Sequence, residues 1–197
     1  MIALGSRQLV LASGSPYRRQ LLSRLGVGVL QDSPELDESP LPGEAPEAIA
    51  ERLAAAKAAA VTAHHPDALV VGSDQVAARG EVIMGKPGDL DRARNQLSGC
   101  SGQWVDFHTG LCVIDARTGD SRQGVERFSV KFRELSEQQI ERYLLREQPF
   151  DCAGSFKAES LGIALFERWR GRDANALIGL PLMLLVDYLT ALGIDVI

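Results

Sequence analysis

Short apolar runs and longer amphipathic stretches alternate along this chain. Apolar runs of strand length, bounded by glycine, proline or small polar residues, predict β-strands. Strands are expected at residues 8–12, 68–71, 104–115 and 124–132, with a hairpin at 76–83 and a further strand within 156–167. Helical spacing of apolar positions predicts helices at residues 16–25, 44–62, 90–98, 136–147 and 182–192. Ser136 and Gln139 have the spacing of a capping box at the start of the fourth of these.

The order of these elements indicates an α/β fold. Strands alternate with helices, but hairpins interrupt the alternation, which favours a mixed sheet over a purely parallel, doubly wound one. The segment 32–46 is expected to be a loop because it carries four prolines and five acidic residues.

Length and composition describe an ordinary globular chain. Its 197 residues are 45% hydrophobic and 24% charged, which predicts a single domain over residues 1–197. No apolar run approaches the ~18–20 residues of a membrane span, and the first ten residues lack the layout of a secretory signal. The three cysteines, Cys100, Cys112 and Cys152, match no zinc or disulfide spacing, which favours the reducing cytoplasm and small core positions for all three.

The charge balance restricts the partners that are expected. The formal net charge is −5, whereas a protein that coats nucleic acid needs a basic surplus to neutralise phosphates. Nucleic acid and membrane are therefore not expected as partners. A small anionic ligand held by a local basic cluster remains compatible with this composition.

The segment from Ser13 to Arg19 has the features of an anion site. A predicted strand leads into Ser-Gly-Ser-Pro and then into a helix, in which Ser15 is the expected N-cap. Free backbone N–H groups and the positive end of the dipole favour an anion there, and Arg18 and Arg19 can grip phosphate oxygens. A solvated arginine pair on an ordinary helix explains the same residues equally well.

Carboxylates and lysines elsewhere complete a candidate polyphosphate site. Asp74 follows a predicted strand, where α/β enzymes place catalytic groups, and a carboxylate there can hold a cation or deprotonate water. Glu38 lies in the proline-rich loop, Lys57 on an alanine-rich helix and Lys86 in a loop. Taken singly, a solvated loop charge accounts for Glu38 and a snorkelling side chain for Lys57. Together these residues suit a metal-bound polyphosphate.

Segments distributed over almost the whole chain resemble the Maf family of nucleoside triphosphate pyrophosphatases. They are LVLASGSPYRRQLLSRLGV (9–27), ELDES (35–39), residues 55–57, VVGSDQV (70–76), GKP (85–87), TGL (109–111), CAGSFKAES (152–160) and IGLPL (178–182). The resemblance implies a fold like that of the inosine-triphosphate pyrophosphatases, with an elongated mixed sheet, flanking helices and two lobes around a cleft. It also implies cleavage between the α- and β-phosphates with the help of a divalent cation, Mg²⁺ or Mn²⁺.

The resemblance also assigns roles. Asp74 matches the family's proton acceptor. Glu38 and Asp74 match the carboxylates with which the family binds its metal. The positions that match its phosphate-binding set are Ser13, Arg18, Arg19, Lys57 and Lys86.

Three positions bear on the substrate. The residues at these positions, Tyr17, Gln75 and Lys157, resemble those of the family branch that acts on N7-methyl-GTP. An aromatic residue suits that base, since N7 methylation gives guanine cationic character and stacking then gains a cation–π attraction. We expect Lys157 to face phosphate or a backbone carbonyl, because a cationic base would repel it.

Two other functions remain open at this point. One is the same chemistry on dTTP or UTP, and the other is a non-catalytic nucleotide-sensing regulator of cell division. The apolar segment 177–192 is a candidate surface for a homodimer.

Overall fold

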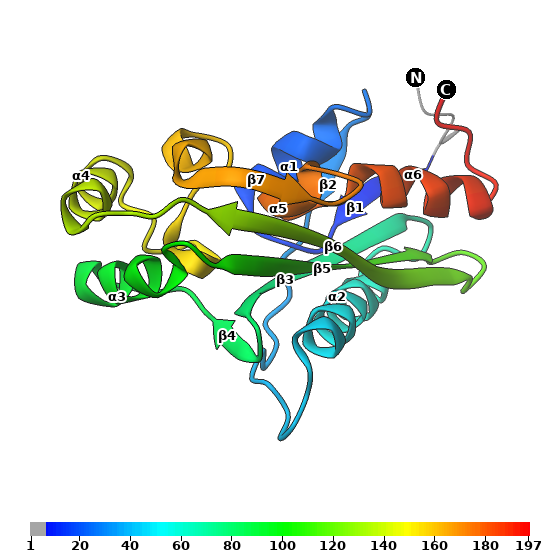
Figure 1. Ribbon diagram of the computed structural model, residues 1–197. Coiled ribbons are helices and arrows are strands. Elements are labelled where there is room, and N and C mark those ends of the chain that lie inside the picture. The colour runs from blue at the N-terminus through cyan, green and yellow to red at the C-terminus, as the bar shows by residue number, and fades with distance from the viewer. Residues whose placement is uncertain (1–6) are drawn as a thin grey trace.

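One mixed β-sheet of seven strands runs through residues 7–197, the part of the chain that the computed structural model describes (Figure 1). The main path has the order β2-β1-β3-β5-β6-β7, and β4 pairs with β3 beside it. The strands are β1 Leu9–Leu11, β2 Val29–Gln31, β3 Leu69–Arg79, β4 Val82–Met84, β5 Trp104–Asp115, β6 Ser121–Phe132 and β7 Phe166–Arg170. Only the pairs of β1 with β2 and with β3 are parallel among these strands, which confirms the mixed α/β sheet. Residues 1–6, which carry part of the expectation about a secretory signal, lie outside the described residues.

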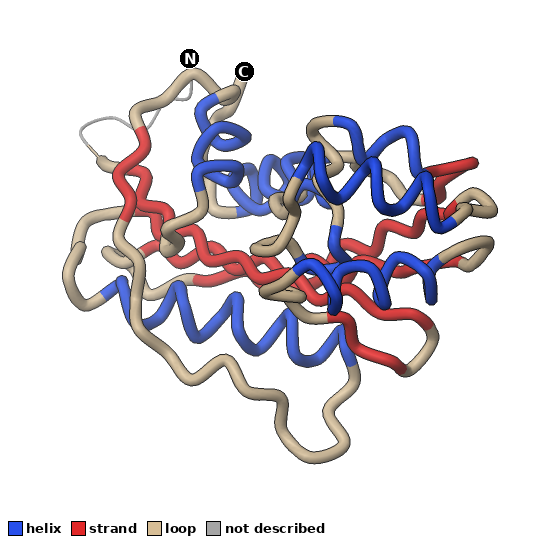
Figure 2. Tube along the Cα trace, turned by 90° about the vertical axis from the view of Figure 1, so that its left-hand side faces the viewer, coloured by secondary structure: helices blue, strands red, loops and turns tan. Residues whose placement is uncertain are grey.

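Helices cover both faces of the sheet. Helix α2 lies along one face, and α1 and α6 lie on the opposite face (Figures 1 and 2). The helices are α1 Pro16–Ser23, α2 Pro46–Thr62, α3 Leu90–Cys100, α4 Glu137–Glu147, α5 Asn175–Ile178 and α6 Leu182–Ala191. None of the helices within residues 7–197 has both the length and the apolar character needed to cross a membrane.

The two covered faces follow from the alternation of side chains along each strand. In β1, Leu9 and Leu11 share a buried cluster with leucines of α1 and α6, such as Leu185. Val10, which lies between them, points the other way and packs with Ala58 of α2. The short first strand is thus buried on both faces, which explains its uninterrupted apolar sequence.

Aromatic side chains fill the other half of the core. Phe107, Phe132, Phe156 and Phe166 pack edge to face, with ring centroids 5.0 to 6.0 Å apart. They belong to a cluster that also receives side chains from α3 and α4. The core is therefore divided into an aliphatic part around β1 and an aromatic part around α3 and α4. These are the two lobes that the family resemblance implies.

Two local predictions about helix starts are confirmed. Ser15 is the N-cap of α1, with Pro16 in the first turn and the Ser15 hydroxyl accepting from the backbone N–H of Arg18. Helix α4 begins with the capping box expected from the spacing of Ser136 and Gln139. Glu44, by contrast, was expected to open α2, but it lies outside this helix, which begins at Pro46.

The strand predicted at 68–71 is observed, but its predicted end is too early. Strand β3 continues through Asp74, which lies opposite Gly110 of β5 in the middle of the ladder rather than at a strand end. The polar run does not stop the strand because the buried hydroxyl of Ser73 has partners. It donates to the carbonyls of Gly110 (2.8 Å) and Gly179 (3.0 Å).

Other differences concern short elements. The sequence predicted neither β2 nor α5, which have three and four residues. The strand expected within 156–167 is confirmed only at the end of that range, because a 3-10 turn at Leu161–Leu165 comes first and β7 begins at Phe166. Strand β7 extends beyond the predicted range, to Arg170.

The apolar segment 177–192 is not a free dimer surface. Leu180, Leu185 and Leu189 of this segment are fully buried against the sheet. The apolar run therefore builds the core of the chain itself, and homodimer formation stays a prediction without this surface.

Helix α2 lies so close to the sheet that only glycine fits below it. A Cβ added at Gly72 would lie 2.2 Å from the carbonyl oxygen of Ala54, and one at Gly110 would lie 2.0 Å from that of Ala50. Both backbone atoms belong to α2, so neither contact can be relieved by turning a side chain. The glycines of β3 and β5 thus set the distance between helix and sheet.

We expect Gly72→Ala to lower the free energy of unfolding by about 1–3 kcal/mol, because the added methyl group must push α2 away from β3. In a chain of this length the melting temperature would fall by roughly 2–12 °C, measurable by calorimetry. Gly28→Ala is the matched control, since a Cβ at Gly28 meets nothing within 4 Å. Equal melting temperatures for the two variants would contradict the close packing of α2.

Candidate active site

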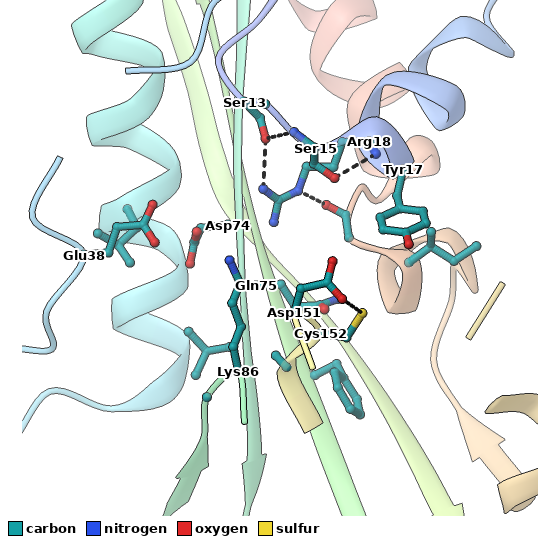
Figure 3. A pocket seen from close by; sticks show the side chains of 18 of the residues that line it. Ser13, Ser15, Tyr17, Arg18, Glu38, Asp74, Gln75, Lys86, Asp151 and Cys152 are labelled. Carbon is teal, nitrogen blue, oxygen red and sulfur yellow. Dashed lines mark hydrogen bonds between the residues drawn. The ribbon is translucent and has the colours of Figure 1, made fainter. Parts of the chain in front are cut away.

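A cavity of about 700 Å³ opens where the N-terminus of α1, the middle of β3 and the segment after α4 come together (Figure 3). Ala12, which follows β1 in the aliphatic part, and Phe156 of the aromatic cluster both line it, so it lies between the two parts of the core. Clefts of this volume commonly hold a small-molecule ligand.

The N-terminus of α1 forms one wall of the cavity. The buried hydroxyl of Ser13 accepts from the backbone N–H of Ser15 (3.2 Å) and from Nη1 of Arg18 (3.2 Å). This side chain therefore draws the arginine of the first turn back over the helix terminus. The result is a guanidinium beside the positive end of a helix dipole, an arrangement that favours a bound anion.

A second contact fixes the other side of the Arg18 guanidinium. Its Nε donates to the carbonyl of Gly179 (2.9 Å), and Gly179 has a φ of +117°, a conformation that favours glycine. The buried carboxylate of Asp173 holds this segment by accepting backbone N–H bonds from the starts of α5 and α6. Burial lowers the pKa of Arg18, while the charges of Asp74 and Glu38 act in the opposite direction.

A buried ammonium joins two carboxylates at the centre of the cavity. The Nζ atom of Lys57 lies 2.6 Å from an oxygen of Asp74 and 2.6 Å from an oxygen of Glu38. The side chains of Lys57 and Asp74 are buried, whereas Glu38 approaches from the proline-rich loop and is more than half exposed. The structure thus brings together three residues from a helix, a strand and a loop. Lys57 is neither a snorkelling side chain nor a solvated one.

The charge of Glu38 is set by these neighbours. Partial burial acts to raise the pKa of its carboxyl, but the hydrogen bond from Lys57 and the charges of Lys57, Lys86 and Arg18 outweigh it and lower the pKa below the ordinary value. Glu38 is therefore a carboxylate at neutral pH. The cationic groups of Lys57, Lys86 and Arg18 lie around the same part of the cavity.

Glu38 and Asp74 are two carboxylates of the cavity that lie close enough together to suit a divalent cation. Both carboxylates converge on one ammonium, so one ion replacing or joining that ammonium would meet oxygens of each. Within residues 7–197, no group of three or more His, Cys, Asp or Glu is arranged to hold a metal ion. A hard cation bound here would need further oxygens from water and from a ligand, which is how Mg²⁺ commonly binds in phosphate sites.

The loop that carries Glu38 is anchored to α2 by an arginine that the sequence reading overlooked. Arg52 donates two hydrogen bonds to the carboxylate of Glu44 (2.6 and 2.7 Å) and a third to the carbonyl of Ser39 (3.2 Å). Glu44 also accepts from the backbone N–H of Leu41 (2.9 Å). These polar contacts position the segment next to Glu38, and the lowered pKa of Glu44, about 2, follows from the bonds with Arg52 and Leu41.

Lys86 enters the cavity from the loop after β4 (Figure 3). Gln96 of α3 holds this loop, since its amide donates to the carbonyl of Gly85 (3.0 Å) and its oxygen accepts from the hydroxyl of Ser155. No motif in the sequence marks Gln96 as part of a site. Its only signal was a polar residue on the inner side of an amphipathic helix.

The wall opposite Glu38 and Asp74 is aromatic and acidic. Tyr17, Asp151 and Cys152 lie there (Figure 3), and Glu159 also lines the cavity. Burial raises the pKa of the Tyr17 hydroxyl, and the carboxylates of Glu159 and Asp151 raise it further. Burial also raises the pKa of Cys152 to about 12, so it stays a neutral thiol. The expectation that Cys152 is a core residue is wrong, because it forms part of the cavity wall.

Gln75 lies between the two ends of the cavity. Its amide nitrogen donates to the carbonyl of Ala176 (2.7 Å) and to the hydroxyl of Thr109 (3.1 Å). It therefore joins β3 to α5 while lining the cavity. This position is compatible with a role in substrate choice.

Two predicted site residues lie elsewhere. Arg19 is exposed on α1 and does not line the cavity, because Ser13 and Gly179 hold only its neighbour Arg18. Lys157 also lies outside the lining. Its Nζ donates to the carbonyl of Glu147 (3.0 Å), so it faces a backbone carbonyl, one of the two alternatives expected. A direct role of Arg19 or Lys157 in binding has no support from this geometry.

The fold and the cavity define a mixed α/β protein with an anion-binding helix terminus facing a buried lysine and two carboxylates. A family model described as Maf-like protein matches residues 8–192, and the chain belongs to this family.

Relatives of nearly full length carry a common name. The chain is 53% identical over 189 residues to the 7-methyl-GTP pyrophosphatase of Nitrosococcus oceani, which covers 96% of this chain and 95% of that protein. It is 51% identical over 187 residues to the protein of the same name from Alcanivorax borkumensis, with 95% of each chain covered. For that of Pseudomonas putida the identity is 52% over 188 residues, which cover 95% of this chain and 98% of the relative.

The anchor between Arg52 and Glu44 predicts a pH-dependent contribution to stability. Because the pKa of Glu44 is lowered from 4.5 to about 2 in the folded chain, its contribution is fully present above about pH 4.5 and is lost as the pH falls through 2. We expect Glu44→Gln to lower the melting temperature by about 1–3 °C at pH 7, as for exposed ion pairs, with a difference that shrinks below pH 4.5. Thermal melts of both proteins from pH 3 to 8 measure it. A difference that grew toward low pH would contradict the anchor.

Proposed function

We propose that the protein hydrolyses N7-methyl-GTP to N7-methyl-GMP and pyrophosphate in the cytoplasm. The observation that carries this proposal is the position of Asp74, a buried carboxylate in a cavity whose walls also carry Arg18, Lys57 and Lys86. A base beside several cations is the arrangement that water attack on a polyphosphate requires.

The reaction is written from the residues present. Water attacks the α-phosphorus, and the bond between that phosphorus and the oxygen bridging to the β-phosphorus breaks. Asp74 accepts the proton of the attacking water, and pyrophosphate leaves with the electron pair of the broken bond. Lys57, 2.6 Å from Asp74, holds the carboxylate in place, while Arg18 and Lys86 bind the phosphates and stabilise their charge.

We also propose that Glu38 and Asp74 hold a divalent cation, Mg²⁺ or Mn²⁺, in the presence of the nucleotide. Carboxylate oxygens are the ligands that these hard cations prefer. When bound, the cation would neutralise phosphate charge and polarise a phosphoryl oxygen. Asp74, which accepts the proton of the attacking water, would also be one of the residues that hold the cation.

Two observations support the methylated purine as substrate. The relatives from Nitrosococcus oceani, Alcanivorax borkumensis and Pseudomonas putida are named as 7-methyl-GTP pyrophosphatases. In addition, Tyr17 offers an aromatic ring in the cavity wall at the end away from Glu38 and Asp74. Such a ring attracts a cationic base.

A substrate panel tests the proposal. We expect the wild-type protein to release pyrophosphate from N7-methyl-GTP with a higher kcat/KM than from GTP, dTTP, UTP or CTP, with Mg²⁺ present, and to lose activity when EDTA removes the cation. Faster turnover of dTTP or UTP would replace the substrate with a pyrimidine triphosphate. Tight nucleotide binding without pyrophosphate release would instead indicate a non-catalytic sensor.

The role of Asp74 is tested by Asp74→Asn, which keeps the shape of the side chain but cannot accept the proton. We expect kcat to fall by about 100-fold or more, with KM changed by less than about threefold. Asp91→Asn, on the exposed surface of α3, is the matched control and should keep kcat within about twofold. An Asp74→Asn protein of near wild-type kcat would remove Asp74 as the base.

A further inference from the structure

The turn between β1 and α1 is supported by a polar side chain that lies outside the cavity. Strands β1 and β2 are parallel, and Leu11 pairs with Gln31, so the two strands end side by side where this turn begins. Gln31 is half-buried at the end of β2 and does not line the cavity. The proposed reaction does not use it.

The amide of Gln31 holds two carbonyl groups of this turn. Its Nε2 donates to the carbonyl of Ser13 (2.9 Å) and to that of Ser15 (3.3 Å). Carbonyl oxygens only accept hydrogen bonds, so two of them around one amide require its nitrogen at this place rather than its oxygen. Both carbonyls are therefore turned toward a side chain that does not line the cavity.

The direction of the Ser13 carbonyl determines where the next N–H group points. In a planar trans peptide the C=O of one residue and the N–H of the next point in opposite directions. Because the Ser13 carbonyl faces Gln31, the N–H of Gly14 faces the opposite side, and Gly14 lines the cavity. No hydrogen bond within residues 7–197 has this N–H as its donor. It is therefore available to a bound anion.

The peptide group between Ser13 and Gly14 could also take the reverse orientation. Turning it over changes the sign of φ at the second residue, and glycine accepts both signs. A carbonyl oxygen would then face the cavity and repel phosphate oxygens instead of an N–H attracting them. The hydrogen bonds from Gln31 stabilise the orientation that suits an anion.

We propose that Gln31 is a positioning residue for phosphate binding. It holds the Ser13 carbonyl away from the cavity, so that the N–H of Gly14 donates to a phosphate oxygen beside the guanidinium of Arg18. The Ser13 hydroxyl holds this guanidinium at the same turn, so one short segment supplies both donors. This inference rests on the proposed function, because that function places the phosphates next to Arg18.

The test uses the full-length chain with Gln31→Met, which keeps the length of the side chain and removes its N–H donors. We expect KM for N7-methyl-GTP to rise by about 10-fold with kcat changed by less than about threefold, since one hydrogen bond to a charged group is lost. A purely structural role would reduce the folded fraction and so lower kcat, with KM unchanged. KM for GTP should rise by the same factor, because both nucleotides share the triphosphate. Gln20→Met, on the exposed side of α1, is the matched control and should keep the wild-type KM.

A conservative variant and a binding measurement complete the test. Gln31→Lys retains an N–H donor for the two carbonyls and should keep KM within about threefold of the wild-type value, whereas a 10-fold rise in this variant would contradict the role of the donor. Calorimetric titration with inorganic tripolyphosphate and Mg²⁺ needs neither a base nor catalysis, so it reports phosphate binding even if pyrophosphate release is not observed. A dissociation constant about 10-fold higher in Gln31→Met supports the inference. An unchanged constant, in a variant whose melting temperature matches the wild type, overturns it and leaves the proposed hydrolysis intact.

Discussion

The buried ammonium of Lys57 is the group on which the rest of the site depends. Its contacts with Asp74 and Glu38 join helix α2, strand β3 and the proline-rich loop at a single nitrogen atom. Removing one partner of a buried ion pair costs about 3–5 kcal/mol, because it leaves an uncompensated charge. The glycines of β3 and β5 allow α2 to lie close to the sheet, and this position brings Lys57 of α2 within reach of Asp74 in β3.

The distribution of charge, rather than its total, matters for this protein. A net charge of −5 disfavours a general polyanion binder, yet the cavity concentrates Arg18, Lys57 and Lys86 at one end. Asp74 and Glu38 temper that basic cluster, and Asp151 and Glu159 form a separate negative wall. The cavity thus presents both signs of charge at different places, a property that total charge does not describe.

Much of the fold was predictable because local signals agreed with the tertiary structure. The N-cap at Ser15 and the capping box at Ser136 act within one helical turn, and their predictions are confirmed. The position of Asp74 in the middle of a strand was not predictable in the same way. Its polar neighbour Ser73 is accommodated there by hydrogen bonds to Gly110 and Gly179, which are distant in sequence. Arg19 and Lys157 show the same limit within the site. Residue type and motif position suggested phosphate or base contacts, but Ser13, Gly179 and Glu147 decide which side chains face the cavity.

The contact between Arg18 and Gly179 has a consequence for the order in which the site forms. It joins residues 161 positions apart, and the Ser73 hydroxyl reaches the same carbonyl across 106 positions. The polypeptide leaves the ribosome from its amino end, so the guanidinium, the buried lysine and both central carboxylates emerge long before the glycine that completes the wall. Completion of this cavity wall therefore waits until the segment around Gly179 has been synthesised.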